Sequence, residues 1–124
     1  MLIFNGLENY GLLILRLVLG VIFLYHGLPK LNGRMGGFMI LIGALEALSA
    51  IAILAGIYTE IAGMALAVIM LGAIFKKTTQ WSIPFSSKGT TGWEFDLILC
   101  GAALALAFLG AGSFSVDSML GYFP

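Results

Sequence analysis

The chain is poor in cysteine and histidine, since Cys100 and His26 are the only residues of either type among its 124 positions. A single thiol excludes an internal disulfide, a Cys-x-x-Cys redox pair and a metal cage of several thiolates. A single imidazole likewise excludes a bis-histidine haem built by one chain. We therefore expect neither a covalent cofactor nor a metal in this chain. Redox chemistry that uses such groups would need a partner subunit.

Charge is equally scarce. Six Lys and Arg residues balance six Asp and Glu residues, and charged residues make up 10% of the chain, against roughly 25% in a typical soluble domain. Without a basic excess, nucleic-acid binding is not expected. Hydrophobic residues make up 60% of the chain and its mean hydropathy is +1.07. So few charges cannot cover a water-soluble monomer, and membrane lipid is the expected surrounding.

The apolar residues form four segments, at 12–31, 38–58, 61–75 and 97–111. The first two are long enough, at a rise of about 1.5 Å per residue, to cross a hydrocarbon layer of roughly 30 Å. The last two are shorter and need flanking residues or a locally thinner membrane. We predict an all-α fold, an integral membrane four-helix transmembrane bundle in a single domain, 1–124. The expected helices cover about 10–31, 37–57, 60–77 and 93–112.

The connections set the expected orientation. Gly56 is a helix stop, and Thr59 is a candidate cap before Glu60 in the first turn of the next helix. The longest polar stretch is a loop at about 77–92. The two connections on the opposite side from the termini carry most of the cations, and the positive-inside tendency makes them cytoplasmic and both termini external. These cations are Lys30, Arg34, Lys76, Lys77 and Lys88.

Glu46 is the most informative residue, because it lies near the middle of the second segment. An ionised carboxyl at that depth needs a partner, so it is a functional candidate by default. The alternative is a structural ion pair or a neutral, hydrogen-bonded acid. Arg16 lies roughly 10 Å from Glu46 along the membrane normal, and His26 is nearer in depth. Both remain open as partners, and Glu46, His26 and Arg16 form a candidate buried polar site.

A second group is expected at the cytoplasmic mouth. Lys30 follows His26 by four residues and shares its face, and Glu94 and Asp96 open the fourth helix at the same level. These three charges form a candidate substrate-binding cluster. The alternative is that Thr91 and Glu94 form a capping box and that Lys30 only anchors to lipid head groups.

The residues carry a resemblance to a known family. The stretch 15–31 contains Arg16, then Gly20 and Phe23, and ends in His-Gly-x-x-Lys-Leu. This pattern resembles the first helix of the DoxX family. Glu46, the Gly56 turn, the start of the fourth helix at 93–97 and the tail at 109–117 are also similar to that family, although Val116 replaces a Leu. The resemblance covers essentially the whole chain.

The resemblance implies a four-helix membrane protein of the prokaryotic plasma membrane. Named members are subunits associated with thiosulfate:quinone oxidoreduction or with complexes that handle thiol and oxidative stress. The family's polar positions correspond to Arg16, His26, Lys30, Glu46 and Glu94. The leading hypothesis is a membrane subunit of a quinone-linked oxidoreductase complex, with a bound quinone and a redox partner subunit.

Two alternatives to this hypothesis are kept. The first is a small proton-coupled transporter or exporter that uses Glu46, as intramembrane carboxyls do in pumps. The second is a non-catalytic scaffold in which the charges only lock the pairing of helices.

Arg16 shares a helix face with Gly20 and Gly27, so its guanidinium is expected to point into the bundle. The other segments carry small residues at the spacing that lets helix backbones approach closely: Gly43, Ala47 and Ala50, then Gly63 and Ala67, then Gly101 and Ala105. Association of several copies into a homo-oligomer is therefore a further expectation.

Overall fold

A computed structural model describes residues 3–89 and 91–121, and this part of the chain contains helices and no strand. The helices, in chain order, are α1 (Glu8–Gly27), the 3₁₀ turn η1 (Leu28–Asn32), α2 (Gly37–Ala55), α3 (Thr59–Phe75), the π-helical turn η2 (Lys76–Gln80), α4 (Trp93–Leu109) and α5 (Val116–Leu120). The predicted all-α fold and its four main helices are confirmed.

Three spans are long and apolar enough to cross a membrane: Glu8–Asn32, Gly37–Ala55 and Thr59–Gln80. The fourth main helix, α4, has 17 residues and packs along α3. It ends at Leu109, a few residues earlier than the sequence predicts, because Gly110 has a φ of +79° that a right-handed helix does not adopt. The short helix α5 was not expected.

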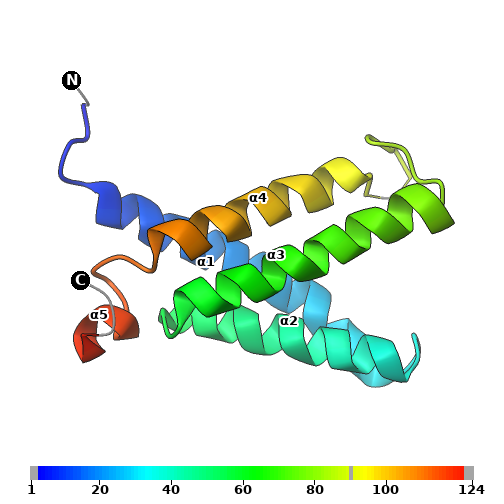
Figure 1. Ribbon diagram of the computed structural model, residues 1–124, viewed down its shortest axis with the longest axis horizontal. Helices are drawn as coiled ribbons and strands as arrows, with labels where there is room; N and C mark the ends of the chain where they lie inside the picture. The colour runs from blue at the N-terminus through cyan, green and yellow to red at the C-terminus, as the bar shows by residue number, and fades with distance from the viewer. Residues whose placement is uncertain (1–2, 90, 122–124) are drawn as a thin grey trace.

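The helices pack as two pairs, α1 with α2 and α3 with α4, joined by the tight α2–α3 hairpin. Figure 1 shows that the start of α1, α5 and the α2–α3 turn lie at one end of the bundle, which we call the terminal end. The α1–α2 connection and the α3–α4 loop lie at the opposite end. We call it the cationic end, because its connections contain Lys30, Arg34, Lys76, Lys77 and Lys88.

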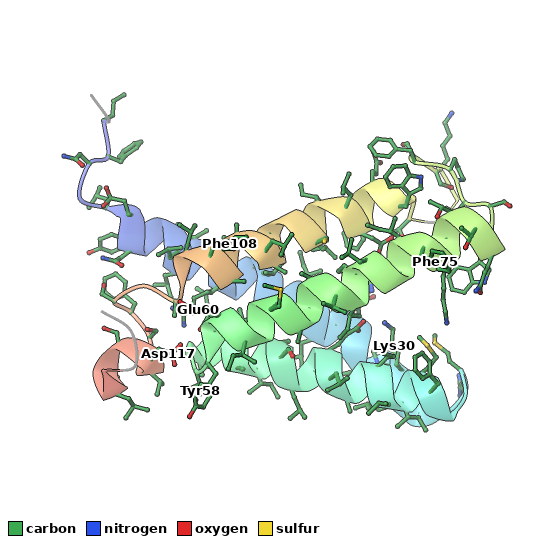
Figure 2. The ribbon with its side chains drawn as sticks, viewed as in Figure 1. Lys30, Tyr58, Glu60, Phe75, Phe108 and Asp117 are labelled. Carbon is green, nitrogen blue, oxygen red and sulfur yellow. The ribbon has the colours of Figure 1, made fainter. Side chains whose placement is uncertain are left out.

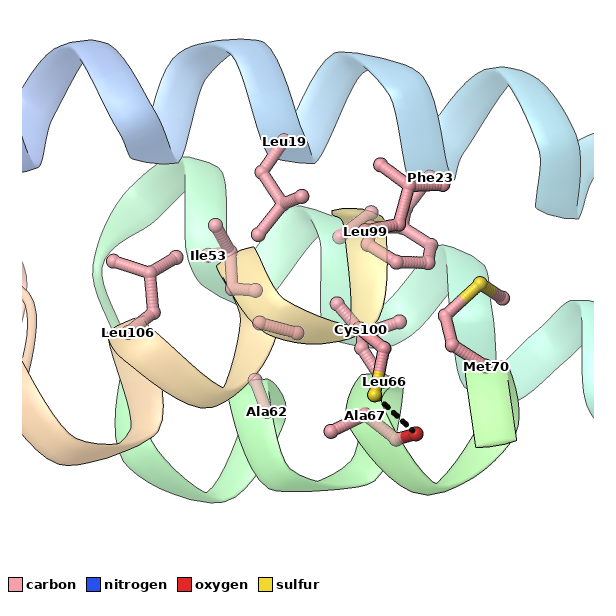
Figure 3. Close-up of a cluster of buried hydrophobic side chains, with 12 residues drawn as sticks. Leu19, Phe23, Ile53, Ala62, Leu66, Ala67, Met70, Leu99, Cys100 and Leu106 are labelled. Atoms are coloured by element: carbon pink, nitrogen blue, oxygen red, sulfur yellow. Dashed lines mark hydrogen bonds between the residues drawn. The ribbon is translucent and has the colours of Figure 1, made fainter. Parts of the chain in front are cut away.

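The core is apolar and closely packed. Phe23, Ile53, Leu66 and Leu106 are buried, one from each main helix (Figure 3). Cys100 is buried among them, with its Sγ 3.6 Å from the carbonyl oxygen of Ala67. A side chain at Gly63 would place a Cβ 2.7 Å from the Ala103 carbonyl oxygen. The α3–α4 contact therefore depends on backbones that touch directly.

The predicted small-residue faces are mostly confirmed. Gly43, Ala47 and Ala50 of α2 are buried, as are Gly63 and Ala67 of α3. The expected packing role of Gly101 is wrong, because this glycine is exposed and nothing lies within 4 Å of its Cβ position. α4 is rotated so that Leu99, Cys100, Ala103 and Leu106 face the core instead.

Candidate functional site

Arg16 is buried at the terminal end of the bundle, with 1% of its surface exposed. Its guanidinium points inward, as its shared face with Gly20 and Gly27 predicts, but it makes no bond to Glu46. Instead it donates hydrogen bonds to backbone carbonyls of two distant segments. Those acceptors are Ile53 O at 2.9 Å, Leu54 O at 3.0 Å, Ala111 O at 3.2 Å and Phe114 O at 2.7 Å.

The end of α2 explains why two of these carbonyls are available. Gly56 takes a left-handed conformation with φ of +75° and ends α2, so Ile53 O and Leu54 O lie among the last carbonyls of that helix, which lack the usual partner one turn further on. Ile53 O also accepts a hydrogen bond from the Gly56 N–H at 3.2 Å. A cation at a helix C-terminus also interacts favourably with the negative end of the helix dipole. A Cβ at Gly56 would lie 2.8 Å from Arg16 Nη2. Glycine is therefore required both by the turn and by the arginine.

Asp117 completes this end of the bundle and was not recognised as a candidate from the sequence. It is 1% exposed, and its carboxylate accepts hydrogen bonds from the backbone N–H groups of Tyr58 at 2.7 Å and Thr59 at 3.1 Å. Its own N–H donates to Gly56 O at 2.8 Å. The expected cap role of Thr59 is wrong, because the N-terminus of α3 is capped by an acid from α5. In the sequence, the one feature that points to Asp117 is its position in the tail at 109–117 that is similar to the DoxX family.

The second buried polar group is an ion pair between Lys30 and Glu46. Lys30 Nζ lies 2.7 Å from Glu46 Oε1, and the exposed fractions of the two side chains are 20% and 0%. The second carboxylate oxygen, Oε2, is buried and has no hydrogen-bond partner in the described part of the chain. The partner of Glu46 is thus Lys30. Neither of the two partners considered from the sequence, Arg16 and His26, bonds to it.

Two glycines bring Lys30 to Glu46. The end of α1 crosses α2 so closely that a Cβ at Gly27 would lie 3.0 Å from the Cβ of Glu46. A Cβ at Gly43 would lie 2.7 Å from the Cβ of Lys30 and 2.8 Å from Gly27 O. Pro29 lies in the 3₁₀ turn that carries Lys30. The crossing therefore holds the ammonium over the carboxylate.

We expect Gly43→Ala to destabilise the protein by about 1–3 kcal/mol, because a methyl group at this crossing forces the two backbones apart. The free energy of unfolding in mixed detergent micelles measures this effect. Gly101→Ala is the matched control, since its Cβ position is open and alanine favours a helix. Equal stability of the two variants would show that the crossing can widen freely.

His26 is half-buried and faces α4 rather than Glu46. Its ring centroid lies 5.5 Å from that of Phe95 and 5.5 Å from that of Tyr25. No hydrogen bond or ion pair joins it to Glu46 among residues 3–89 and 91–121. A relay or ligand role for His26 stays a prediction.

The structure divides the predicted cluster of Lys30, Glu94 and Asp96. Lys30 pairs with Glu46, whereas Asp96 Oδ2 lies 2.6 Å from Lys77 Nζ. This second contact is an ion pair without hydrogen-bond geometry, because Lys77 directs its bonds to the oxygens of Thr91 at 3.1 and 3.3 Å. Glu94 is exposed. The capping box of Thr91 and Glu94, the alternative to a functional cluster, does not form, since Gly92 is the N-cap of α4 and there is no side-chain cap bond.

The Lys30–Glu46 pair lies on an apolar groove of about 1200 Å³ between α2 and α3. In Figure 2, Lys30 and Phe75 mark its cationic end, and Glu60 and Phe108 mark the other. Apolar walls come mainly from exposed side chains of α2 and α3 such as Phe38, Leu45, Ile61 and Val68. Arg16 and His26 do not line this groove. No group of three metal-ligating side chains occurs in the described residues.

Comparison with known proteins adds two findings. The profile of the DoxX family matches residues 11–79, a range that contains Arg16, His26, Lys30 and Glu46. The chain is 31% identical over 125 aligned positions to a Bacillus subtilis (strain 168) protein named "Putative oxidoreductase CatD", covering 91% of this chain and 89% of that protein. No solved structure matches the chain.

Proposed function

The chain belongs to the DoxX family, and on this premise we propose that it is the membrane subunit of a quinone-linked oxidoreductase complex of the prokaryotic plasma membrane. The Lys30–Glu46 pair carries the proposal, because it is a buried ion pair on a groove whose walls are mainly apolar. Buried charges in a membrane segment are costly and mark functional sites by default. The oxidoreductase name of the Bacillus relative supports the same class of activity.

The groove fits a quinone in shape and chemistry. An apolar channel between two helices suits a flat ring and a hydrocarbon tail, and a few convergent polar groups suit the ring oxygens. Lys30 supplies donors, and the buried Glu46 Oε2 has acceptor capacity that no described residue uses. A buried polar atom without a partner calls for an explanation, and contact with the hydroxyl of a reduced ring provides one.

The chain's own residues would bind the ring and hold a proton. A bound quinone supplies a couple of two electrons and two protons. After its bond to Glu46, the Lys30 ammonium has two N–H donors left, and it can donate one to a ring oxygen. Glu46 accepts a proton at Oε2 or returns it there. The Lys30 ammonium can balance negative charge that develops on the ring.

The electrons would come from a partner subunit. The sequence has one cysteine and one histidine, too few for the usual haem or iron–sulfur ligand sets within one chain. We therefore propose that this subunit provides the membrane-embedded quinone site and that the redox centre resides in the partner.

The test is the quinone content of protein purified gently from its native membrane. We expect about one quinone per protomer, and a loss of at least about tenfold in Glu46→Gln, because a charged hydrogen bond contributes roughly 1.5–3 kcal/mol. Extraction and chromatography quantify the quinone. Glu60→Gln is the matched control, since Glu60 lines the far end of the same groove. Quinone at the lipid background, or full retention in Glu46→Gln, would refute the proposed site.

A further inference from the structure

The cationic end of the groove carries a second set of polar side chains that the quinone proposal does not use. Lys76, Gln80 and Trp81 line the rim of the groove, beyond the Lys30–Glu46 pair. Lys76 lies on the α3 side with its Nζ 5.6 Å from the ring centroid of Phe38 on α2. It has no carboxylate partner among the residues that the structure describes. The Lys76 ammonium is therefore a cation at the mouth of the groove.

The rim offers donors without acids. The ammonium of Lys76, the amide of Gln80 and the indole N–H of Trp81 can all donate hydrogen bonds. The neighbouring Lys77 is already neutralised by Asp96, and Glu46 is engaged by Lys30. An anion therefore matches this rim, whereas an ammonium or choline group finds no free carboxylate on it.

The groove below the rim suits an acyl chain. Its walls are mainly apolar, and the side chains of Phe38, Val68 and Phe75 on these walls are exposed. Its volume of about 1200 Å³ exceeds the roughly 300–1,000 Å³ of pockets that hold one small molecule. The groove therefore has room for a hydrocarbon chain beside a second ligand.

We infer that the rim of Lys76, Gln80 and Trp81 binds the phosphate of an anionic phospholipid, one acyl chain of which enters the groove. Two observations support this assignment. The donors of the rim complement an anionic phosphate, and the rim continues directly into the apolar groove. The assignment is independent of the quinone chemistry, because none of the three rim residues belongs to the Lys30–Glu46 pair. It stands even if that pair proves to be structural.

Trp81 provides the readout, because it is 58% exposed at the rim and the chain has one other tryptophan. In a Trp93→Phe background, the protein is placed in phosphatidylcholine vesicles that contain acyl-brominated phosphatidylglycerol or acyl-brominated phosphatidylcholine. We expect half-maximal quenching of Trp81 at an about fivefold lower mole fraction of the anionic lipid, as one lysine near a charged surface provides.

Two variants make the test specific. Lys76→Gln should abolish the fivefold preference, whereas Lys88→Gln should keep it, because Lys88 is exposed in the same loop region but does not line the groove. Equal quenching by the two lipids in the parent protein would overturn the inference. So would a preference that survives Lys76→Gln, or one that both variants lose equally, since the latter indicates diffuse attraction to the whole cationic end.

Discussion

Replacing Arg16 with Met is expected to prevent stable folding. The substitution removes the donor to four carbonyl oxygens from α2 and from the segment after α4, of which Ile53 O also accepts from the Gly56 N–H at 3.2 Å. An unsatisfied buried acceptor costs roughly 1–3 kcal/mol, so we expect the other three carbonyls to give a total loss of about 3–9 kcal/mol. That loss is comparable to the whole stability of a small domain. Unfolding in mixed detergent micelles and the yield from membranes both report it.

Arg34→Met is the matched control, because Arg34 is exposed and its side chain makes no hydrogen bond or ion pair with a described residue. Arg16→Lys should fall between the two, since an ammonium keeps the charge but cannot reproduce the planar fork of donors. An Arg16→Met protein as stable as Arg34→Met would show that the free carbonyls find other partners.

The inward direction of Arg16 could be predicted from the sequence, but its partners could not. Helical spacing relative to Gly20 and Gly27 places the arginine on a packed face, and the structure confirms this. Its acceptors are backbone carbonyls, which every residue carries, and they lie 37 to 98 positions away. Nothing in the side-chain pattern marks a carbonyl as free until the end of the helix and the path of the tail are known.

The depth of Glu46 marks it as a functional candidate, but depth alone does not reveal its partner. With a constant rise per residue, Arg16 and His26 lie closest in depth to Glu46, and Lys30 lies at the mouth of the bundle. The structure instead crosses α1 and α2 at Gly27 and Gly43, and a 3₁₀ turn carries Lys30. The long lysine side chain spans the remaining depth, as such side chains do at membrane interfaces. A backbone crossing of this kind depends on three-dimensional packing.

The split of the cluster at the cationic end has a similar cause. The sequence places Lys30, Glu94 and Asp96 at the same depth in the membrane, where opposite charges are expected to form ion pairs. The π-helical turn after α3 brings Lys77 to Asp96 and Thr91. A prediction from sequence periodicity treats each helix as a regular α-helix, so it does not include a π-helical turn. Two separate ion pairs result, and only the Lys30–Glu46 pair has a carboxylate that is completely buried.

Substitutions in the Lys30–Glu46 pair are expected to have unequal effects on stability. Lys30→Met leaves a fully buried carboxylate without its cation, which costs about 3–5 kcal/mol. Glu46→Met should cost less, because the Lys30 side chain is 20% exposed and can turn its ammonium toward water. The double variant should unfold within about 1 kcal/mol of the parent, since an apolar pair avoids the desolvation cost of both charges. The free energies of unfolding of the four proteins form a double-mutant cycle.

The same four proteins separate chemistry from scaffolding. If the pair only locks α1 against α2, the double variant regains both its stability and its bound quinone. If the pair forms the polar end of a quinone site, stability returns but quinone binding does not, because Met offers neither a donor for a ring oxygen nor a carboxylate for a proton. We expect the second result. A stable double variant that retains quinone would assign Lys30 and Glu46 to the architecture of the bundle alone.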